Sequence, residues 1–304
     1  MNSVDSLFDQ IKARAPQALV RLNEPLAKRT TLRVGGCADV YVEPSSEADL
    51  ARVIKCCRDD GTPFMVLGRG SNLLVRDGGF RGVVICLAQP AFSAIEANGP
   101  LLRCGAGARL KAVAAKAREL NLGGLEFLDG IPGSVGGALR MNAGAMGCAT
   151  FEIVSHVRFM DWSGNIEERD AADVPVEYRS CPLFKTKIVL GATFRGQPDS
   201  KAAITKRSEE FNKSRWSSQP KEPSAGCIFK NPSKTTPAGR LVDELGLKGT
   251  RRGGAIVSSV HGNFIVNDGS GTAADVLELI AFIKSRAKAE RGIELREEVE
   301  IIGE

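Results

Sequence analysis

The chain has 304 residues, of which 43% are hydrophobic and 25% are charged, and its formal net charge is +5. This composition is typical of a globular protein with two or three compact lobes, and it excludes collagen-like and disordered classes. No apolar run reaches the roughly 20 residues of a membrane-spanning helix, and no Lys/Arg block marks a nucleic-acid-binding arm. A mild positive charge suits a small anionic substrate.

The residue types also limit the location and the chemistry that we expect. The first residues mix acidic and basic side chains where a secretory signal would be apolar, so we expect a cytoplasmic protein. Eight cysteines occur without a CxxC pair, which favours free thiols and no metal site. Because only two histidines exist, His156 and His261, catalysis has to use other residue types.

Residues 38–87 predict an α/β unit early in the chain. "ADVYVEP" (38–44) and "PFMVLG" (63–68) predict strands, and between them a helix begins at Ser46, with Asp49 placed as in a capping box. A second unit follows, in which 101–107 predicts a strand and 108–120 a helix. "EIVSHVRFMDWSGNIEER" (152–169) then alternates like a β-hairpin with its turn at 163–165.

The character of the sequence changes near residue 198, where "GQPDSKA" (196–202) predicts a linker. A basic helix should follow and stop at Pro220, and a second should run from Thr236 and Pro237 to Gly246. "NFIVN" (263–267) predicts a strand, and Thr272 with Asp275 caps a long helix. In the predicted last strand, 293–303, alternation buries Ile293, Leu295, Val299 and Ile301 and puts Glu294, Arg296, Glu298 and Glu300 on the other face.

Two glycine clusters predict close approach between backbone and a ligand. "LGRGSNLLV" (67–75) follows an apolar strand and can present N–H groups to a phosphate, although a tight turn is the commoner meaning of a lone GxG. The second cluster comprises Gly130, Gly133, Gly136, Gly137, Gly144 and Gly147. "GAGARL" (105–110) has Leu110 at the third glycine position of a dinucleotide fingerprint, so we do not expect a nicotinamide-binding Rossmann site there.

Several segments resemble the UDP-N-acetylenolpyruvoylglucosamine reductase family of flavoenzymes, which act in peptidoglycan precursor synthesis. They are "RTTLRVGG" (29–36), "VLGRGSNLLV", "GLEFLDGIPGSVGGALRMNAGAMG", "YRSC" (178–181), "PSAGCIFKNP" (223–232), "AGRLVDELGLKG" and "IELREEVEIIGE". They occur in the family's order over nearly the whole chain. Because only Tyr41 and Tyr178 are present, the chain resembles the shorter form of the family, which lacks a loop that closes over the substrate with a tyrosine.

The resemblance implies an α+β fold with a two-lobed FAD-binding domain of the vanillyl-alcohol-oxidase type at 1–197, the lobes meeting near residues 87 and 88. A C-terminal α+β substrate-binding domain would occupy 198–304, with its last strand returning to the active site. NADPH would reduce non-covalently bound FAD and leave, and the flavin would then reduce UDP-N-acetylglucosamine enolpyruvate to UDP-N-acetylmuramate. We expect no nucleic-acid, membrane or obligate protein partner.

The resemblance also assigns the binding residues. The cofactor set is Gly68, Arg69, Gly70, Ser71, Asn72, Gly130, Ile131, Gly133, Ser134, Gly137, Asn142, Ala143, Gly144 and Val189. Tyr178, Lys230, Asn231 and Arg215 are expected to bind the substrate, and Lys206, Arg207 and Lys213 are further candidates for its diphosphate. Basic residues spread round a helix are more often solvated, so the alternative for this last group is an exposed face.

Three catalytic residues are implied. Arg179 would stabilise the negative charge that hydride addition builds on the carboxylate side, because its guanidinium is always charged and binds carboxylates in bidentate fashion. Glu298 would assist by hydrogen bonding. Cys227 stands where the family most often has a serine that protonates C2, and a thiol is a stronger acid than a hydroxyl. Judged by residue type alone, Cys227 is core filler, Arg179 a surface residue and Glu298 part of a solvated face.

Two other classes of function stay open on the sequence. The first is a different flavin oxidoreductase of the same cofactor fold, such as a sugar or alcohol oxidase with covalently tethered flavin. His156 lies outside the glycine clusters, which argues against a histidine tether. The second is a non-enzymatic regulator that binds flavin or a UDP-sugar and never oxidises NADPH.

Overall fold

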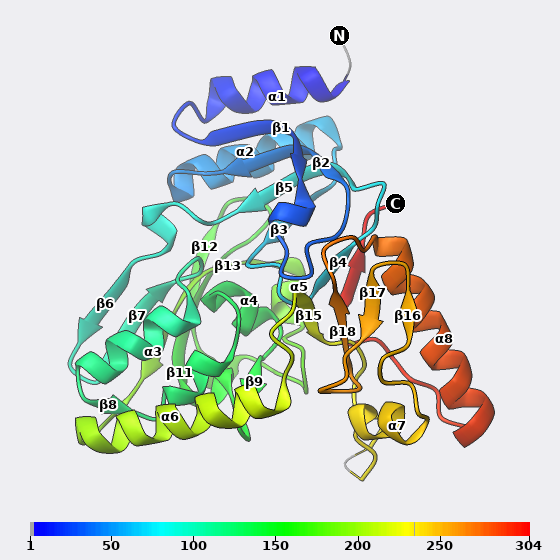
Figure 1. The fold of residues 1–304 in the computed structure, drawn as a ribbon. Helices are drawn as coiled ribbons and strands as arrows, with labels where there is room; N and C mark the ends of the chain where they lie inside the picture. The colour runs from blue at the N-terminus through cyan, green and yellow to red at the C-terminus, as the bar shows by residue number, and fades with distance from the viewer. Residues whose placement is uncertain (1–2, 234) are drawn as a thin grey trace. The chain divides into compact units, whose positions relative to one another are not determined.

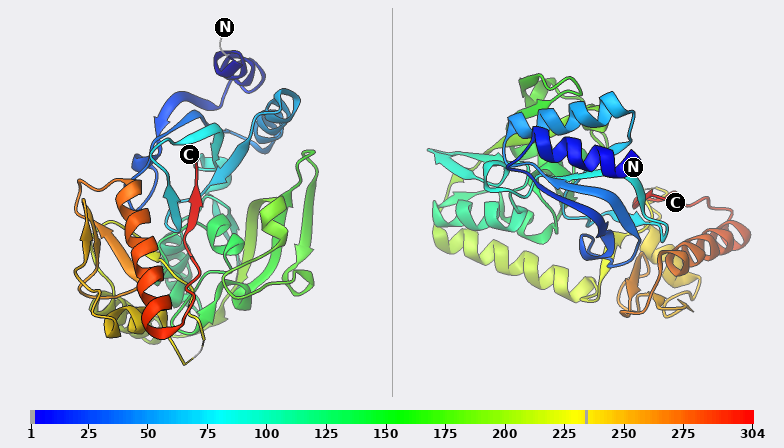
Figure 2. Two further views of the ribbon diagram at one scale, coloured as in Figure 1. Left: turned by 90° about the vertical axis from the view of Figure 1, so that its right-hand side faces the viewer. Right: turned by 90° about the horizontal axis from the view of Figure 1, so that it is seen from above.

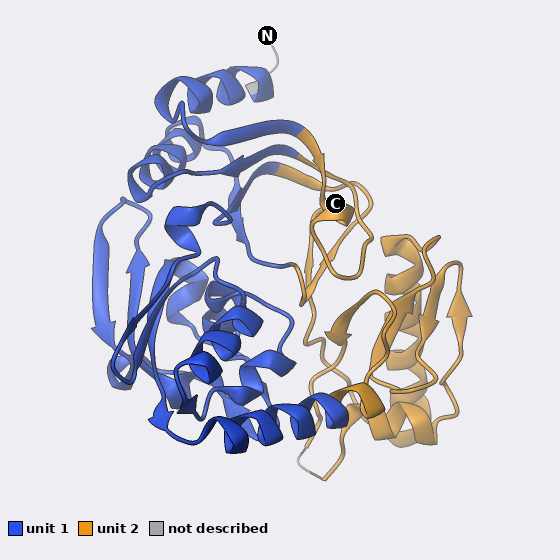
Figure 3. Cartoon of the chain, turned by 60° about the vertical axis from the view of Figure 1, so that its left-hand side comes forward, with its two compact units in different colours: residues 1–22, 39–69, 82–214 blue, residues 23–38, 70–81, 215–304 orange. Residues whose placement is uncertain are grey.

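The computed structural model describes residues 3–233 and 235–304 (Figure 1). The chain forms two compact units, and each contains segments that are far apart in sequence (Figure 3). Unit 1 comprises residues 1–22, 39–69 and 82–214, and unit 2 comprises 23–38, 70–81 and 215–304. Their hydrophobic cores are separate.

The first layer of unit 1 is built from a four-stranded sheet and two helices that pack against each other (Figure 2). The strand order is β1-β2-β5-β3, with β3 and β5 parallel. The elements are α1 (Ser3–Arg14), β1 (Leu19–Pro25), β2 (Cys37–Glu43), α2 (Glu47–Asp60), β3 (Phe64–Leu67) and β5 (Phe80–Cys86), and the short η1 (Leu26–Lys28) between β1 and β2 falls within unit 2. As predicted, Ser46 caps α2 by accepting a hydrogen bond from the Asp49 N–H, and Gly61 ends the helix with φ +70°. The Asp49 carboxylate itself binds Ser45 and Arg52.

A five-stranded antiparallel sheet of order β12-β11-β13-β7-β6 forms the second layer of unit 1. Its strands are β6 (Ile95–Asn98), β7 (Leu101–Gly105), β11 (Val154–Met160), β12 (Ile166–Asp170) and β13 (Ile188–Arg195). The shorter elements around it are η2 (Pro90–Phe92), α3 (Leu110–Glu119), β8 (Leu122–Gly123), η3 (Glu126–Gly130), α4 (Val135–Arg140), β9 (Gly144–Ala145), β10 (Cys148–Ala149), η4 (Thr150–Ile153), η5 (Ala171–Asp173) and α5 (Leu183–Thr186). The predicted hairpin is confirmed as β11 and β12, with Asp161 accepting hydrogen bonds from the Ser163 and Asn165 N–H groups.

The "GAGARL" segment follows β7 and opens α3, but β7 belongs to an antiparallel sheet, unlike the strand of a parallel dinucleotide-binding unit. Its glycines have a packing reason. A Cβ at Gly105 would lie 2.3 Å from the Phe92 carbonyl oxygen, and one at Gly107 would lie 1.9 Å from the Leu87 carbonyl oxygen. Only glycine allows the two backbones to approach so closely.

Unit 2 consists of an antiparallel sheet of order β15-β18-β17-β16, two helices and a separate parallel strand pair. The elements are β4 (Leu73–Val75), β15 (Ser224–Cys227), α7 (Ala238–Glu244), β16 (Arg251–Arg252), β17 (Ala255–Val257), β18 (Phe264–Asn267), α8 (Ala273–Arg291) and β19 (Glu300–Ile302). Its core combines Leu32, Val34 and Leu74 from the early segments with the buried face of α8. The predicted capping box of Thr272 and Asp275 is confirmed, and Gly292 ends α8 with φ +65°.

Three expected elements differ from the structure. The expected linker, 196–202, contains β14 (Gln197–Pro198), which pairs with β8, and the basic helix α6 (Lys201–Ser218) begins within it. Helix α7 begins one residue late, so Pro237 is its N-cap and not its first residue. The last strand is confined to Glu300–Ile302, where it pairs with the short β4. The predicted burial still holds for Leu295 and Val299.

Within the residues that the structure describes, none of the helices has both the length and the apolar character needed to cross a bilayer. All eight cysteines are free thiols.

Candidate active site

Unit 1 holds most of the glycine-rich backbone that the sequence assigns to the cofactor. Gly68 follows β3, and a Cβ placed on it would lie 3.0 Å from Ser134 Oγ and 3.9 Å from Gly137 Cα, so the two glycine clusters meet here. Among described residues, a Cβ at Gly137 would contact only the Ser134 hydroxyl at 3.7 Å, and one at Gly130 would contact only Ala145 at 4.0 Å. Backbone that is open on this side lets a ligand approach its N–H groups, which bind phosphate oxygens. The residues therefore fit a flavin dinucleotide.

The other predicted cofactor residues of unit 1 lie in different environments. Arg69 is exposed, whereas Val189 is buried in the core on β13. Ile131, Gly133 and Ala143 are half-buried. The Asn142 side chain is engaged at both ends, since its amide nitrogen donates to the Glu177 carbonyl at 3.3 Å and its oxygen accepts from the Phe151 N–H at 3.3 Å. Asn142 thus connects the 177–180 segment to the loop that precedes Gly144.

Arg179 lies in a tight turn between Glu177 and Ser180. The turn is closed by two backbone hydrogen bonds, from the Glu177 N–H to the Ser180 carbonyl at 2.8 Å and from the Ser180 N–H to the Glu177 carbonyl at 3.2 Å. Arg179 has φ +57°, a left-handed conformation that costs a residue with a Cβ about 1–2 kcal/mol. Its guanidinium lies 5.3 Å from the ring centroid of the exposed Tyr178. Backbone strain of this kind is concentrated at functional sites.

The Arg179 guanidinium packs against Gly144 in the β9–β10 hairpin. A Cβ on Gly144 would lie 3.2 Å from Arg179 Nη1 and 2.5 Å from the Cys148 carbonyl oxygen. A side chain at residue 144 would therefore collide with the facing strand on one side and crowd the guanidinium on the other, which explains why this residue is glycine. The glycine density of 130–147 could be seen in the sequence, but its relation to Arg179 could not.

In unit 2, Cys227 is the last residue of β15, immediately after a bulge. Ser224 pairs with Val266 and Cys227 pairs with Phe264, with a register shift between these two pairs. Gly226 has φ +76°, which is the conformation that a bulge of this kind requires. The bulge sets the direction of the Cys227 side chain, which is half-buried and is therefore not simple core filler.

Glu298 and the loop at 71–72 lie beside the end of β15. The Glu298 N–H donates to the Ile228 carbonyl at 2.8 Å, and the Asn72 side-chain amide donates to the Glu298 carbonyl at 3.0 Å. The Glu300 N–H in turn donates to the Asn72 carbonyl at 3.0 Å. Unit 2 thus brings together four predicted site residues: Ser71, Asn72, Cys227 and Glu298. Glu298 is half-buried, so the interpretation of a fully solvated face does not apply to it.

Thr31 fixes this arrangement, although no role was predicted for it. Its hydroxyl lies 2.7 Å from the Ser224 carbonyl and 3.3 Å from the Gly70 carbonyl, and its N–H donates to the same Gly70 oxygen at 3.2 Å. Gly70 is buried with φ +59°, and a Cβ there would lie 2.8 Å from Thr30 Cα. Thr31 therefore holds the start of the 70–72 loop against β15. Its place in the "RTTLRVGG" segment was the only available signal.

The predicted substrate residues have several structural roles. Lys230 is half-buried, and its N–H donates to the Arg296 carbonyl at 2.9 Å. The Asn231 side-chain oxygen accepts from the Ala238 N–H at 2.9 Å, so it caps α7, which Pro237 cannot do. Arg215 lies over the Trp216 ring at 5.0 Å and donates to the Gln219 side chain at 3.2 Å.

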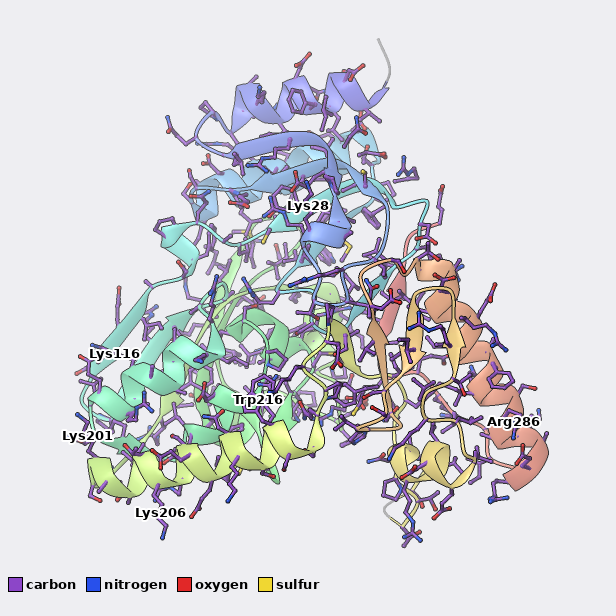
Figure 4. The ribbon with its side chains drawn as sticks, viewed as in Figure 1. Lys28, Lys116, Lys201, Lys206, Trp216 and Arg286 are labelled. Atoms are coloured by element: carbon purple, nitrogen blue, oxygen red, sulfur yellow. The ribbon has the colours of Figure 1, made fainter. Side chains whose placement is uncertain are left out.

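The basic residues of α6 that precede Arg215 differ in how they are engaged. Lys206 and Lys213 are exposed, and Lys206 projects from the helix (Figure 4). Arg207 instead pairs with Asp199 and Glu126. These hydrogen bonds raise the pKa of Arg207 and lower that of Asp199. The pair joins α6 to η3 within unit 1.

A separate cavity of about 130 Å³ lies on the five-stranded sheet of unit 1, lined by Gly105, Gly191 and the ion pair of Glu47 with Arg158. It contains none of the predicted site residues, and it is smaller than the roughly 300 Å³ at which ligand pockets begin. We assign no ligand to it. Over residues 3–233 and 235–304, no cluster of three or more His, Cys, Asp or Glu side chains is arranged to hold a metal ion.

Comparison with known proteins matches both parts of the chain to family models. Residues 38–169 match an FAD binding domain, and residues 219–302 match the C-terminal domain of UDP-N-acetylenolpyruvoylglucosamine reductase. The solved UDP-N-acetylenolpyruvylglucosamine reductase of Thermus caldophilus superposes with a TM-score of 0.81 at 36% identity, covering 94% of this chain and 99% of its own. The glucose dehydrogenase Phl p 4.0202 shares the fold alone, with a TM-score of 0.50 at 15% identity over 74% of this chain and 52% of its own. The predicted fold class is confirmed.

Curated relatives match over nearly their whole length. The UDP-N-acetylenolpyruvoylglucosamine reductase of Geobacter metallireducens is 43% identical over 301 residues, which is 99% of both chains. That of Heliobacterium modesticaldum is 45% identical over 283 residues, covering 92% of this chain and 90% of its own. On this identity and coverage, the chain belongs to the UDP-N-acetylenolpyruvoylglucosamine reductase family.

Proposed function

We propose that the protein reduces UDP-N-acetylglucosamine enolpyruvate to UDP-N-acetylmuramate with NADPH and bound FAD, in the cytoplasm, as a step of peptidoglycan precursor synthesis. Family membership makes it an FAD-dependent oxidoreductase. The observation that carries the specific reaction is the group of residues at the end of β15. There the residue after Cys227 accepts a hydrogen bond from the Glu298 N–H, so a thiol and a carboxyl are held on neighbouring backbone.

Bound FAD would supply the hydride chemistry, with NADPH as the hydride donor, flavin N5 as the reactive position and C3 of the enolpyruvyl group as the acceptor. In the proposal, the cofactor approaches the backbone at Gly130 and Gly137, where an added Cβ would meet little, and at the exposed Gly68. Hydride delivery leaves negative charge on the substrate's carboxylate side. The Arg179 guanidinium neutralises that charge, and its strained turn and the glycine beneath it fix its direction.

Cys227 then donates its thiol proton to C2, which completes the addition of hydrogen across the double bond. The thiolate that remains takes a proton from solvent before the next turnover. Glu298, in its protonated form, donates a hydrogen bond to the substrate carboxylate and so assists its polarisation. Because a general acid contributes typically 10²–10⁴-fold, the loss of the Cys227 proton should be visible in this half-reaction alone.

The same proposal assigns the binding of each ligand to a part of the chain. Residues 1–197 would bind FAD and residues 198–304 the UDP-sugar, with the last strand contributing Glu298. Tyr178, Lys230, Asn231 and Arg215 would contact the substrate. For Asn231 this would involve the amide nitrogen, since its side-chain oxygen caps α7.

The test follows the flavin through both half-reactions in one sample. The purified protein should be yellow, should release its flavin on denaturation, and should lose its visible absorbance on anaerobic addition of NADPH. The absorbance should return on addition of UDP-N-acetylglucosamine enolpyruvate. A protein that binds flavin but is not bleached by NADPH or NADH would refute the enzymatic proposal, and one that is bleached but is reoxidised only by oxygen would refute this substrate.

A further inference from the structure

Asn263, which precedes β18, forms three hydrogen bonds with the two residues that follow Cys227. Its side-chain oxygen accepts from the Phe229 N–H at 2.8 Å, and its side-chain nitrogen donates to the Phe229 carbonyl at 2.8 Å. Its own carbonyl accepts from the Ile228 N–H, also at 2.8 Å. Asn263 is buried, with 3% of its surface exposed. The amide therefore continues the β15–β18 pairing beyond the end of the strands, where a side chain replaces the missing backbone partner.

The opposite side of the same short segment is held by the chain around Glu298. The Ile228 carbonyl accepts from the Glu298 N–H at 2.8 Å, and Phe229 forms an isolated bridge with Glu297. Residues 228–229 thus lie between Asn263 on one side and 297–298 on the other. Because Cys227 is bonded to Ile228 and Glu298 donates to it, this segment sets the positions of both proposed catalytic groups.

The chemistry of asparagine suits this position. Ile228 and Phe229 are each only 1% exposed, so their backbone polar groups need partners within the protein. An amide supplies one donor and one acceptor in a plane, which matches the N–H and carbonyl of a single residue. A hydroxyl carries its donor and its acceptor on a single atom, and an ionised carboxylate has no donor, so neither reproduces this pair.

We propose that Asn263 is a positioning residue for the protonation step: its amide holds residues 228–229 so that Cys227 and Glu298 keep a fixed arrangement. Asn263 touches neither substrate nor cofactor in this role. The inference rests on the proposed function. It adds a residue that the pattern "NFIVN" identified only as the start of a strand.

Unit 2 offers a matched control at the other end of β18. Asn267 has the same 3% exposure, and its side chain also binds backbone, donating to the Leu32 carbonyl and accepting from the Gly269 and Gly271 N–H groups. It has no side-chain hydrogen bond to 228–229. Removing either amide leaves buried backbone groups unsatisfied, so stability alone does not distinguish the two residues.

The experiment compares Asn263→Ala, Asn263→Asp and Asn267→Ala with the wild type, each as the FAD-loaded full-length protein in anaerobic stopped flow. We expect both alanine variants to lower Tm and to be reduced by NADPH at the wild-type rate. Asn263→Ala should slow reoxidation by the enolpyruvyl substrate by roughly 10- to 100-fold, with little change in the substrate Kd, because small misplacements of a catalytic group have effects of that size. Asn267→Ala should reoxidise at the wild-type rate.

Asn263→Asp supplies a second readout that does not depend on the control. A protonated carboxyl has one donor and one acceptor and reproduces the amide's two bonds, whereas the ionised form cannot donate to the Phe229 carbonyl. The ratio of variant to wild-type reoxidation rates should therefore fall as the pH rises and this carboxyl ionises, while the ratio of reduction rates stays flat. His261, whose Nδ1 accepts from the Asn263 N–H at 3.1 Å, is present in both proteins, so the ratio removes its contribution.

The outcomes separate the two proposals. If the wild-type flavin is not reoxidised by the enolpyruvyl substrate, the proposed function is wrong and the positioning role is wrong with it. If the wild type turns over but Asn263→Asp shows a flat ratio, or if Asn263→Ala slows both half-reactions equally, the positioning role alone is refuted. The role is supported if only reoxidation falls and the ratio depends on pH as described.

Discussion

The Gly226→Ala substitution adds a single methyl group. It should slow the reaction with the enolpyruvyl substrate while the protein still folds. Gly226 has φ +76° at the bulge that directs Cys227. A Cβ there would lie 3.8 Å from the Ser71 carbonyl oxygen, which is ordinary van der Waals contact. The Gly226→Ala substitution therefore meets no steric barrier, and its effect arises from the backbone conformation alone.

The magnitude follows from that conformation. A residue with a Cβ in the left-handed region costs about 1–2 kcal/mol, and alanine recovers roughly 0.4–1 kcal/mol of this by restricting the unfolded chain. We expect a net loss of about 1 kcal/mol in the free energy of unfolding, or a fall in Tm of about 4 °C for a unit of this size, at roughly 2.1 cal/mol/K of unfolding entropy per residue. To relieve the strain the backbone at 226 must rotate, and this rotation turns Cys227. Reoxidation by the enolpyruvyl substrate should slow by on the order of tenfold or more.

Gly246→Ala is the matched control for this measurement. Gly246 lies in the same unit with φ +67°, ends α7 and has no described atom within 4 Å of an added Cβ. The two variants should have similar Tm values by calorimetry and similar rates of flavin reduction by NADPH, and only Gly226→Ala should be slow in reoxidation. Equal reoxidation rates in the two variants would show that the bulge does not direct the proton donor, and the reasoning would be refuted.

Three further substitutions test other parts of the site. Cys227→Ala should leave reduction by NADPH intact but slow reoxidation by about 10²-fold or more, whereas Cys227→Ser should keep measurable turnover; full turnover in the alanine variant would remove the thiol from the mechanism. Gly144→Ala places a Cβ 3.2 Å from Arg179 Nη1 and should weaken substrate binding at least about tenfold, measured by titrating the oxidised flavin spectrum; wild-type affinity would contradict the packing argument. Burial, assisted by Lys248, lowers the pKa of His261 below its usual value of 6.5, so the folded state favours the neutral ring. The resulting stability is present above pH 6.5 and is lost as the pH falls through the folded pKa, so Tm should drop less between pH 7.5 and 5.5 in His261→Asn than in the wild type; equal drops would show that this ring is not responsible.

The elements that the sequence predicts well are those whose signals are local. Helix α8 has its capping box at Thr272 and Asp275 and its terminal glycine at 292, all within one continuous segment. The β11–β12 hairpin likewise contains its own turn, in which Asp161 binds the Ser163 and Asn165 N–H groups. In both cases the residues that determine the structure are close neighbours in the chain.

The elements that it predicts poorly depend on partners far along the chain. The alternation of residues 293–303 indicates a long strand, but the ladder that the described residues form with β4 is three residues long, so regular pairing is limited to 300–302. Gln197 and Pro198 look like a linker because proline and polar residues favour loops, yet β8 pairs with them. Residues 23–38 and 70–81 join the core of unit 2 although no local pattern indicates it.

The candidate site likewise has features that could be predicted from the sequence and features that depend on contacts with distant residues. Residue types and spacing identified the two glycine clusters, and the family resemblance assigned the segments that carry Arg179, Cys227 and Glu298. They did not reveal the bonds made by polar side chains, such as the Asn231 cap of α7 or the Asn263 clamp on Phe229. An asparagine has the same appearance in a sequence whether its amide is available to a ligand or already bound to the protein.

The discontinuous composition of unit 2 has a consequence for how the chain is made. Leu32, Val34 and Leu74 emerge early from the ribosome, but the helix against which they pack and the strand that pairs with β4 are translated last. These early apolar segments therefore have no packing partner until synthesis is nearly complete, and until then they are accessible to chaperones and proteases. We expect stalled nascent chains that lack residues 273–304 to be cleaved readily within 23–38 and 70–81, and released full-length chains to resist cleavage there.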